Sequence, residues 1–550
     1  MIVALLFRLW FIDKPEGLWN DEYMGWYIAS KNNFSDFIAI MLQNCHMPFY
    51  FLYLKGWMFL FGDTDISLRF SSVIPSLCTI IAVFFAGREL KDTKLGLFTA
   101  FLTAINSFCI YFAQEVRLYS LIMLFTTLIV MYFIKITRLP SKRNFIIYFL
   151  LNALLCMTHT LGVIFSFFNI AAAIVYLYRE KGFFKEKVKA AVEFLKYTAP
   201  FIVVVLLLLP LLFIIVSSKS LSQFWAEFSF SRVFFSFLDY FSPIQTNIIN
   251  SPGTICAHIF NNEKFNFIFI IFAIVPALMG IFALYNAVLQ KNKTINYLLS
   301  ASLLYFISLI AISLTGKMIL LTKYSSEIYP VIILAAAYGL ISIKKKTFKY
   351  ILIGLLITVN LFYLLTSNDA APKRTRSEGH LAVVQLLKNS RLKSKDFVIL
   401  TYYDIDKFER YLDSSAQYNF SSINKFNFNY VIFNNENYYE TIHLGKRLYK
   451  DNLAEFPNKT VTKYILSNYI CKMNKGDKIG IVFLDTVSFL SNQKIQDIIQ
   501  EDDRYNRTPF IFLAFSALRN SILYSFKTGY KIDSITQAGD WTLFVFEKTE

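Results

Sequence analysis

The chain has 550 residues, of which 55% are hydrophobic and 18% aromatic, and its mean hydropathy is +0.46. Charged residues make up 17% of the chain, whereas soluble domains carry about 25%. This composition excludes an ordinary soluble protein and predicts a multi-pass α-helical membrane protein. The net charge of +17 does not indicate a nucleic-acid partner, because the charges lie mostly in short loops between apolar segments.

Eleven apolar segments are predicted to cross the membrane. The first is short, so either it is a short span or the chain starts inside a longer helix. The others approach the roughly 17–25 residues that a spanning helix needs. The expected spans lie near residues 1–12, 70–87, 95–112, 118–135, 144–158, 160–178, 197–216, 264–288, 295–315, 325–343 and 349–366.

The loops between these segments predict the orientation of the chain. One alternate set of loops holds 19 Lys and Arg, and the other set, although longer, holds nine. Positive residues collect on the cytoplasmic side. The N-terminus is therefore expected in the cytoplasm, and large loops at 13–69 and 217–263 are expected on the extracytoplasmic side. The membrane is expected to be a bacterial inner membrane.

The chain changes character after residue 366. A polar linker is expected at 367–380, and residues 381–550 read as an extracytoplasmic α/β domain. Short β-branched and aromatic runs at 396–404, 430–434 and 478–485 predict strands, and 530–548 predicts a hairpin turning near Gly539 and Asp540. Residues 511–527 have helical periodicity, with a twelfth span as the alternative.

The cysteines do not form a paired framework. Cys78, Cys109 and Cys156 fall inside apolar segments and are expected to be small buried hydrophobes. Cys45 and Cys256 fall in expected outer loops, where a disulfide between them is one option.

Polar residues that are unusual for such a chain sort to the expected outer face. Asp21 and Glu22 lie side by side in the first outer loop, among several aromatic residues. The other candidates follow at the outer ends of later segments: His46, Arg69, Glu115, Arg117, His159, Lys323 and Tyr324.

Each candidate has an ordinary structural explanation. Arg69 and Lys323 could snorkel to the interface, and Arg117 could form a structural ion pair with Glu115. His46 and His159 could be satisfied interfacial histidines. The aromatic residues around Asp21 suit a membrane-interface belt as well as a substrate platform.

The combination favours transfer from a phosphate-activated lipid donor. A carboxylate takes the proton from an incoming hydroxyl. Arginine and lysine hold the leaving phosphate and spread its developing charge. The sequence contains no Walker loop, no GxGxxG after a strand and no HExxH.

Residues 1 to about 345 resemble the polyprenyl-phosphate-sugar glycosyltransferases of the GT-C fold. The likeness is to the bacterial branch of the protein O-mannosyltransferase superfamily, which includes the lipid A aminoarabinose transferases. Its motifs occur in the family's order: FRLW, NDEYMGWYIA, HMPFYFLYLKGWMFLFG, SLRFSSVIPSL, YFAQEVRLYSL, THTLG and TKYSSEIYP.

The resemblance implies that an acidic residue in the first outer loop acts in catalysis. Asp21 matches the base, and Glu22 matches a residue that positions the acceptor or a metal. It also implies that the donor phosphate is bound near the outer ends of spans, by Arg69, Arg117 and Lys323 with Tyr324. The supporting residues in this scheme are Glu115, His46 and His159.

The implied reaction is an inverting displacement at the sugar carbon that leaves polyprenyl phosphate. No cofactor is certain, although some relatives hold a divalent metal near the site. The expected partners are a polyprenyl-phosphate-linked sugar, membrane lipids, and an extracytoplasmic lipid, glycan or protein acceptor.

The sequence departs from the family's pattern in two places. His46 is followed by Met47 and Pro48 where the family has His-Pro-Pro, and Lys323 stands where arginine is common. Lysine is a point charge without the bidentate fork of arginine, so phosphate binding is expected to be less directional.

Two other functions remain open at this point. A transporter or flippase of a lipid-linked or anionic substrate also carries charges at span ends, although no internal repeat is visible. A structural or assembly protein would leave the clustered charges unexplained.

Overall fold

The computed structural model describes most of the N-terminal two thirds of the chain and parts of the remainder. The described residues are 1–14, 17–44, 46–181, 187–217, 228, 230–242, 274–315, 319–366, 386–387, 389–390, 392, 397–400, 419–422, 473–484, 530–538 and 541–549. The chain divides into two compact units. One comprises Met1–Asp13 and Met24–Arg374, and the other comprises Lys14–Tyr23 and Thr375–Glu550.

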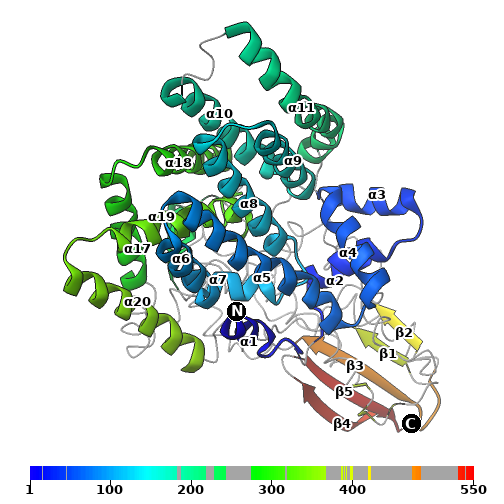
Figure 1. Cartoon of the computed structure of the whole chain (residues 1–550). Coiled ribbons are helices and arrows are strands. Elements are labelled where there is room, and N and C mark those ends of the chain that lie inside the picture. Colours follow the sequence, from blue (N-terminus) through cyan, green and yellow to red (C-terminus); the bar gives the residue numbers. More distant parts are fainter. Residues whose placement is uncertain are drawn as a thin grey trace. The chain divides into compact units, whose positions relative to one another are not determined.

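The first unit is built from helices (Figure 1). In chain order they are α1 (Ile2–Leu9), α2 (Asn20–Ser30, which begins in the second unit), α3 (Phe34–Gln43), α4 (Pro48–Phe61), α5 (Asp65–Leu90), α6 (Thr93–Ile105), α7 (Ser107–Ala113), α8 (Tyr119–Arg138), α9 (Lys142–Thr158), α10 (Gly162–Lys181), α11 (Lys187–Ser217), α13 (Phe230–Leu238), α17 (Val275–Leu289), α18 (Lys293–Ser313), the 3₁₀ helix η2 (Thr322–Ile328), α19 (Tyr329–Ile341) and α20 (Lys346–Thr366).

Each of the eleven apolar segments expected from the sequence overlaps a helix in the described residues, although 264–273 of the segment 264–288 lies outside them. Seven helices are long and apolar enough to cross a membrane. The pair α6 and α7 adds an eighth span if its 60° bend lies within one crossing. The expected segments at α1, α9 and α17 form shorter helices, of 8, 17 and 15 residues. The predicted class, an integral membrane protein with many helices, is confirmed.

Short polar residues fix where several helices begin. The side chains of Thr64, Asp92 and Ser141 accept hydrogen bonds from backbone N–H groups in the first turns of α5, α6 and α9. Asn292 does the same for α18. Such N-caps satisfy donors that have no partner within the helix.

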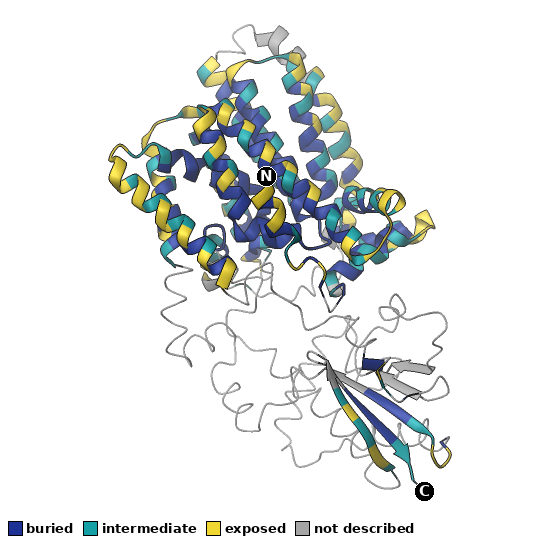
Figure 2. Cartoon of the chain, turned by 60° about the horizontal axis from the view of Figure 1, so that its bottom comes forward, coloured by how far each residue is buried: buried dark blue, intermediate teal, exposed yellow. Residues whose placement is uncertain are grey.

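Burial separates inner from outer helices (Figure 2). In the spanning windows, 78% of α8 and 89% of the segment from η2 through α19 are buried, against 17% of α11. The outer helices expose large apolar side chains such as Leu207 and Phe213. A helix in contact with lipid presents an apolar face, because the bilayer core contains no water that could solvate polar groups.

Close helix contacts depend on small residues. A Cβ added to Gly339 on α19 would lie 1.8 Å from the carbonyl oxygen of Ala283 on α17. A Cβ added to Gly96 on α6 would lie 2.5 Å from the carbonyl oxygen of Phe84 on α5. Small residues at such crossings let helix backbones approach each other in membranes.

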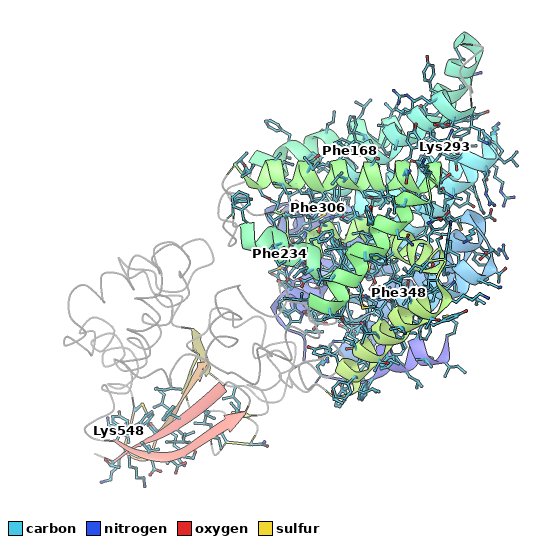
Figure 3. The ribbon with its side chains drawn as sticks, turned by 90° about the vertical axis from the view of Figure 1, so that its left-hand side faces the viewer. Phe168, Phe234, Lys293, Phe306, Phe348 and Lys548 are labelled. Carbon is cyan, nitrogen blue, oxygen red and sulfur yellow. The ribbon has the colours of Figure 1, made fainter. Side chains whose placement is uncertain are left out.

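Helices α13 and α18 contact each other through aromatic side chains, one of which, Phe306, is labelled in Figure 3. The rings of Phe237 on α13 and Phe306 on α18 lie 6.4 Å apart, centroid to centroid. This contact brings the described part of the expected outer loop 217–263 against a predicted span.

The described part of the C-terminal region contains a five-stranded sheet of order β2-β1-β3-β5-β4. Its strands are β1 (Phe397–Leu400), β2 (Asn419–Ser422), β3 (Lys478–Leu484), β4 (Tyr530–Ala538) and β5 (Trp541–Lys548). β1 pairs in parallel with β2 and β3, whereas β5 pairs antiparallel with β3 and β4. Apolar residues from β3 and β5, among them Ile481 and Val545, are fully buried.

Three of the predicted strand regions are confirmed. β1 lies in 396–404, β3 lies in 478–485, and β4 and β5 are the paired strands of 530–548. β2 was not expected, because the run Asn419–Ser422 is short and three of its four residues are polar. The predicted strand at 430–434, the helix at 511–527, the linker at 367–380, the turn at Gly539–Asp540, and Cys45 and Cys256 lie outside the described residues.

Candidate active site

The acidic pair lies in the first turn of α2. Glu22 is only 1% exposed, and its Oε2 accepts a hydrogen bond from the backbone N–H of Trp19 at 3.2 Å. Asp21 is half-buried. A carboxylate in this position lies at the positive end of the helix dipole. Glu22 thereby caps the start of its own helix.

α2 continues into the helical unit and packs against the turn that follows α7. A Cβ added to Gly25 would lie 3.2 Å from the carbonyl oxygen of Val116. Val116 stands between two site candidates, Glu115 and Arg117. Glycine at this position allows the close approach of α2 to that turn.

The turn at 114–118 is buried and anchored to two distant segments. Glu115 and Arg117 are each 7% exposed. The side-chain amide of Gln114 donates to the carbonyl oxygens of Arg8 at 3.1 Å and Trp10 at 2.6 Å. Backbone carbonyls at the end of α1 thereby hold the turn in place.

α5 supplies the second anchor of this turn. The hydroxyl of Ser72 donates to the carbonyl oxygen of Arg117 at 3.3 Å. Arg69, almost one turn earlier on α5, is 1% exposed, and its guanidinium donates to the carbonyl of Ile12 at 2.9 Å. Arg69 thus holds the N-terminal segment from inside the protein. A snorkelling side chain would instead extend to the membrane interface. The Arg117 guanidinium lies 5.8 Å from the ring centre of Tyr119.

His159 pairs with a carboxylate far away in the sequence. The residue ends α9, and its Nδ1 lies 2.5 Å from Oε1 of Glu327 on η2. Oε2 of Glu327 accepts a hydrogen bond from the Tyr305 hydroxyl of α18 at 2.9 Å. Glu327 is fully buried. The structure therefore joins His159, η2 and α18 at one point.

The rest of η2 is anchored by the turn after α13. The hydroxyl of Thr322 donates to the fully buried Asp239 at 2.8 Å. The Tyr240 hydroxyl donates to the carbonyl oxygen of Ser325 at 2.8 Å. Burial raises the pKa of Tyr240, so its hydroxyl keeps the proton that it donates. These contacts hold the segment on either side of Lys323 and Tyr324.

Lys323 and Tyr324 are adjacent on η2 and partly exposed. The Lys323 ammonium lies 4.9 Å from the ring centre of Tyr324. A cation over an aromatic face keeps its charge while gaining a preferred direction. The ring therefore gives the lysine some of the orientation that an arginine fork would otherwise supply.

Aromatic rings connect the 114–118 turn with the η2 region. Phe112 lies 4.6 Å from Tyr119 and 4.9 Å from Phe108, centroid to centroid. Phe108 lies 6.0 Å from Tyr240 and 5.0 Å from Tyr329. The elements that carry Arg117 and Lys323 are thus packed on a shared aromatic core.

His46 is placed differently from the other candidates. Its ring lies 5.4 Å from that of Phe51, and Met47 precedes the first turn of α4, where Pro48 occupies an early position. The aromatic residues near Asp21 also differ among themselves. Tyr23 is buried, Trp26 donates to Asp63 at 3.1 Å, and Tyr27 lies 3.6 Å beneath the ammonium of Lys31.

Within the described residues, no group of three or more His, Cys, Asp or Glu side chains is arranged to hold a metal ion. The acidic and imidazole groups instead make protein hydrogen bonds, as Glu22 does with Trp19 and Glu327 does with His159.

Sequence reasoning missed two buried carboxylates of this region. Glu327 lies inside the TKYSSEIYP motif, and Asp239 precedes Tyr240 in the expected outer loop. A carboxylate beside an apolar span is costly unless paired, which was a usable signal for Glu327. The pairing of Glu327 with Tyr305 and His159 gave no signal, because neither partner lies near it in the sequence.

Solved structures similar to this chain include two of ArnT and one of an archaeal oligosaccharyltransferase. ArnT from Cupriavidus metallidurans in the apo state has a TM-score of 0.48 and 10% identity, over 99% of this chain and 96% of that chain. ArnT bound to undecaprenyl phosphate has a TM-score of 0.47 and 11% identity, with the same coverage. AglB, an archaeal oligosaccharyltransferase from Archaeoglobus fulgidus in complex with an inhibitory peptide and a dolichol-phosphate, has a TM-score of 0.43 and 10% identity, over 87% and 68%.

These structures have the GT-C fold, which is the fold that the sequence motifs resemble. No protein-family model matches the chain, and no curated protein matches it by sequence. With TM-scores below 0.5, the roles of individual residues rest on the geometry of this chain alone.

Proposed function

We propose that the protein is a membrane glycosyltransferase that moves a sugar from a polyprenyl-phosphate donor to an extracytoplasmic lipid, glycan or protein acceptor. The observation that carries the proposal is that polar segments far apart in the sequence come together at the ends of helices. Arg117 is tied to α5 through Ser72, and His159 is tied to η2 through Glu327. α8 also packs against η2.

In this scheme the basic residues bind the donor phosphate. Arg117 and Lys323 supply positive charge from two elements that share one aromatic core, with Tyr324 orienting the lysine. Arg69 acts through the N-terminal segment that it clamps. Positive groups fixed before the reaction stabilise the charge that develops on the leaving phosphate.

Asp21 is the proposed base. It lies in the first turn of α2 and matches the catalytic acidic residue that the sequence resemblance implies. The carboxylate takes the proton of the acceptor hydroxyl, whose oxygen forms the new bond to the sugar carbon as the bond to phosphate breaks. Direct displacement inverts the configuration at that carbon, and polyprenyl phosphate leaves. Glu22, the capping residue, holds the turn that carries Asp21.

The proposed location is the bacterial cytoplasmic membrane, with the N-terminus inside and the C-terminal region outside. The charge distribution among the loops supports this orientation. It puts the donor site on the side where an envelope acceptor is found.

The experiment for the proposal is a transfer assay with purified protein in detergent micelles. Radiolabelled polyprenyl-phosphate sugars serve as donors and a membrane extract serves as acceptor. The proposal predicts that label enters the extract while polyprenyl phosphate is released in equal amount. Binding of donor without turnover of any sugar would contradict it.

A transporter or flippase is the second candidate, and one feature favours it. The span formed by α6 and α7 is bent by 60°, and broken helices are typical of transporter binding sites. Movement of intact lipid-linked sugar across proteoliposomes, without its cleavage, would support this alternative.

A further inference from the structure

Glu327 is a buried carboxylate that the proposed transfer step does not use. It is fully buried, and its two oxygens contact Nδ1 of His159 at 2.5 Å and the Tyr305 hydroxyl at 2.9 Å. Burying a carboxylate is costly unless hydrogen bonds and an opposite charge compensate it. Glu327 lies on the same short helix as Lys323. We therefore ask which part of this helix the buried carboxylate holds in place.

Glu327 fixes one end of η2. Its partners come from the end of α9 and from α18, so the end of the segment is held from two sides. The start of η2 is held separately, by the hydrogen bond from Thr322 to Asp239. Lys323 and Tyr324 lie between these two anchors. The backbone that carries the two side chains is therefore held on both sides.

The same carboxylate also orients His159. Nδ1 is the ring nitrogen that faces Oε1 of Glu327 and shares a proton with it. Nε2 is then the nitrogen left for a ligand. The His159 side chain keeps 13% exposure, whereas that of Glu327 has none. The exposed part of the pair is thus the imidazole.

We propose that Glu327 is a positioning residue of a lipid-phosphate site. It sets the direction of η2, and it turns His159 so that Nε2 joins Lys323 and Tyr324 in contacting the phosphate oxygens. The ligand class is a phosphate ester carried on a lipid chain. This inference rests on the proposed function and deepens it.

The test measures the affinity of the purified full-length protein for polyprenyl phosphate in detergent micelles. The variants are Glu327→Gln, His159→Asn and the double variant. Glutamine keeps the shape of the side chain and an acceptor for Tyr305, and it removes the charge. Glu89→Gln is the matched control, since it removes a carboxylate that pairs with Arg138 at 3.5 Å on another part of the unit. Thermal unfolding of each variant is recorded in parallel.

Each single variant is expected to weaken binding about tenfold, and the double variant is expected to bind no more weakly than the weaker single one. Groups that act as a unit give such non-additive effects. Glu89→Gln is expected to bind like the wild type. If Glu327→Gln does not fold, Tyr305→Phe replaces it, removing one hydrogen bond to the same carboxylate.

Unchanged affinity in folded Glu327→Gln and His159→Asn would overturn the inference while leaving the proposed function intact. Losses that multiply in the double variant would also overturn it, because they indicate two independent contributions. Absence of lipid-phosphate binding by the wild type would instead overturn the proposed function itself.

Discussion

Arg8 shows how a single buried charge can organise the start of this fold. It has no exposed surface, and its guanidinium donates to the hydroxyl of Ser76 at 2.8 Å and to the carbonyl oxygens of Ala104 at 3.1 Å and Thr103 at 3.4 Å. Those carbonyls belong to the last turn of α6, just before the bend into α7. A cation there also faces the negative end of the helix dipole.

Replacing Arg8 should destabilise the protein. Arg8→Met leaves the carbonyls of Thr103 and Ala104 without these donors, at an expected cost of roughly 2–4 kcal/mol. The melting temperature in detergent should fall clearly below that of the wild type. Arg88→Met serves as the control, because Arg88 is exposed at the end of α5 and its loss should change little. Equal melting of Arg8→Met and the wild type would contradict the role of Arg8.

At the scale of elements, backbone approach decides which helices pack together. α17 and α19 cross where Gly339 meets the backbone of Ala283. α19 follows directly from η2, so its position also fixes the segment that carries Lys323. The packing of α17 against α19 thereby supports the candidate site.

A methyl group at this crossing should be harmful. Gly339→Ala would bring a Cβ within 1.8 Å of a backbone oxygen, and overpacking of this kind costs roughly 1–3 kcal/mol. Gly354→Ala on α20 is the matched variant, because nothing lies within 4 Å of its Cβ position. Gly354→Ala should be neutral or stabilise by about 0.5–1 kcal/mol. Thermal unfolding of the two variants side by side distinguishes them, and an equal effect would rule out the close crossing.

At the scale of the whole molecule, the sequence predicted elements better than it predicted contacts. Apolar length and β-branched runs located the apolar segments of the helical unit and most of the described strands, because those signals are local, but they did not predict α2, α3, α4 and α13 in the expected outer loops. The pairing of His159 with Glu327 depends on residues 168 positions apart, and no local pattern reports it. β2 was missed for a different reason, because its four residues carry too weak a local signal for a strand.

The same local reasoning grouped Arg69 with Lys323 as basic residues at span ends, and Glu22 with Asp21 as an acidic pair. The structure separates them, since Arg69 clamps the carbonyl of Ile12 and Glu22 caps its own helix. Residue type and spacing indicated that these side chains were unusual. They gave no information on which backbone group each would bind, because that depends on how the helices pack.

The orientation in the membrane is a prediction for the whole chain. Alkaline phosphatase, which is active only outside the cytoplasm, can be fused after Lys345 or after Thr366. The positive-inside rule predicts an inactive fusion at Lys345 and an active one at Thr366. Immunoblots of both fusions control for expression. The reverse pattern would place the candidate site on the cytoplasmic side.

The measurement that tests the central claim most directly is sugar transfer by Asp21→Asn. Asparagine keeps the size of the side chain and cannot accept the proton of the acceptor hydroxyl. Asp36→Asn is the matched control, since Asp36 is an exposed carboxylate in the first turn of α3. Donor binding and thermal unfolding confirm that both variants are intact.

Loss of a general base typically lowers the rate about 10²–10⁴-fold. The account predicts that Asp21→Asn binds donor normally and releases polyprenyl phosphate at least 100-fold more slowly than the wild type, roughly the lower end of that range, while Asp36→Asn keeps full activity. Full activity in folded Asp21→Asn would contradict the account.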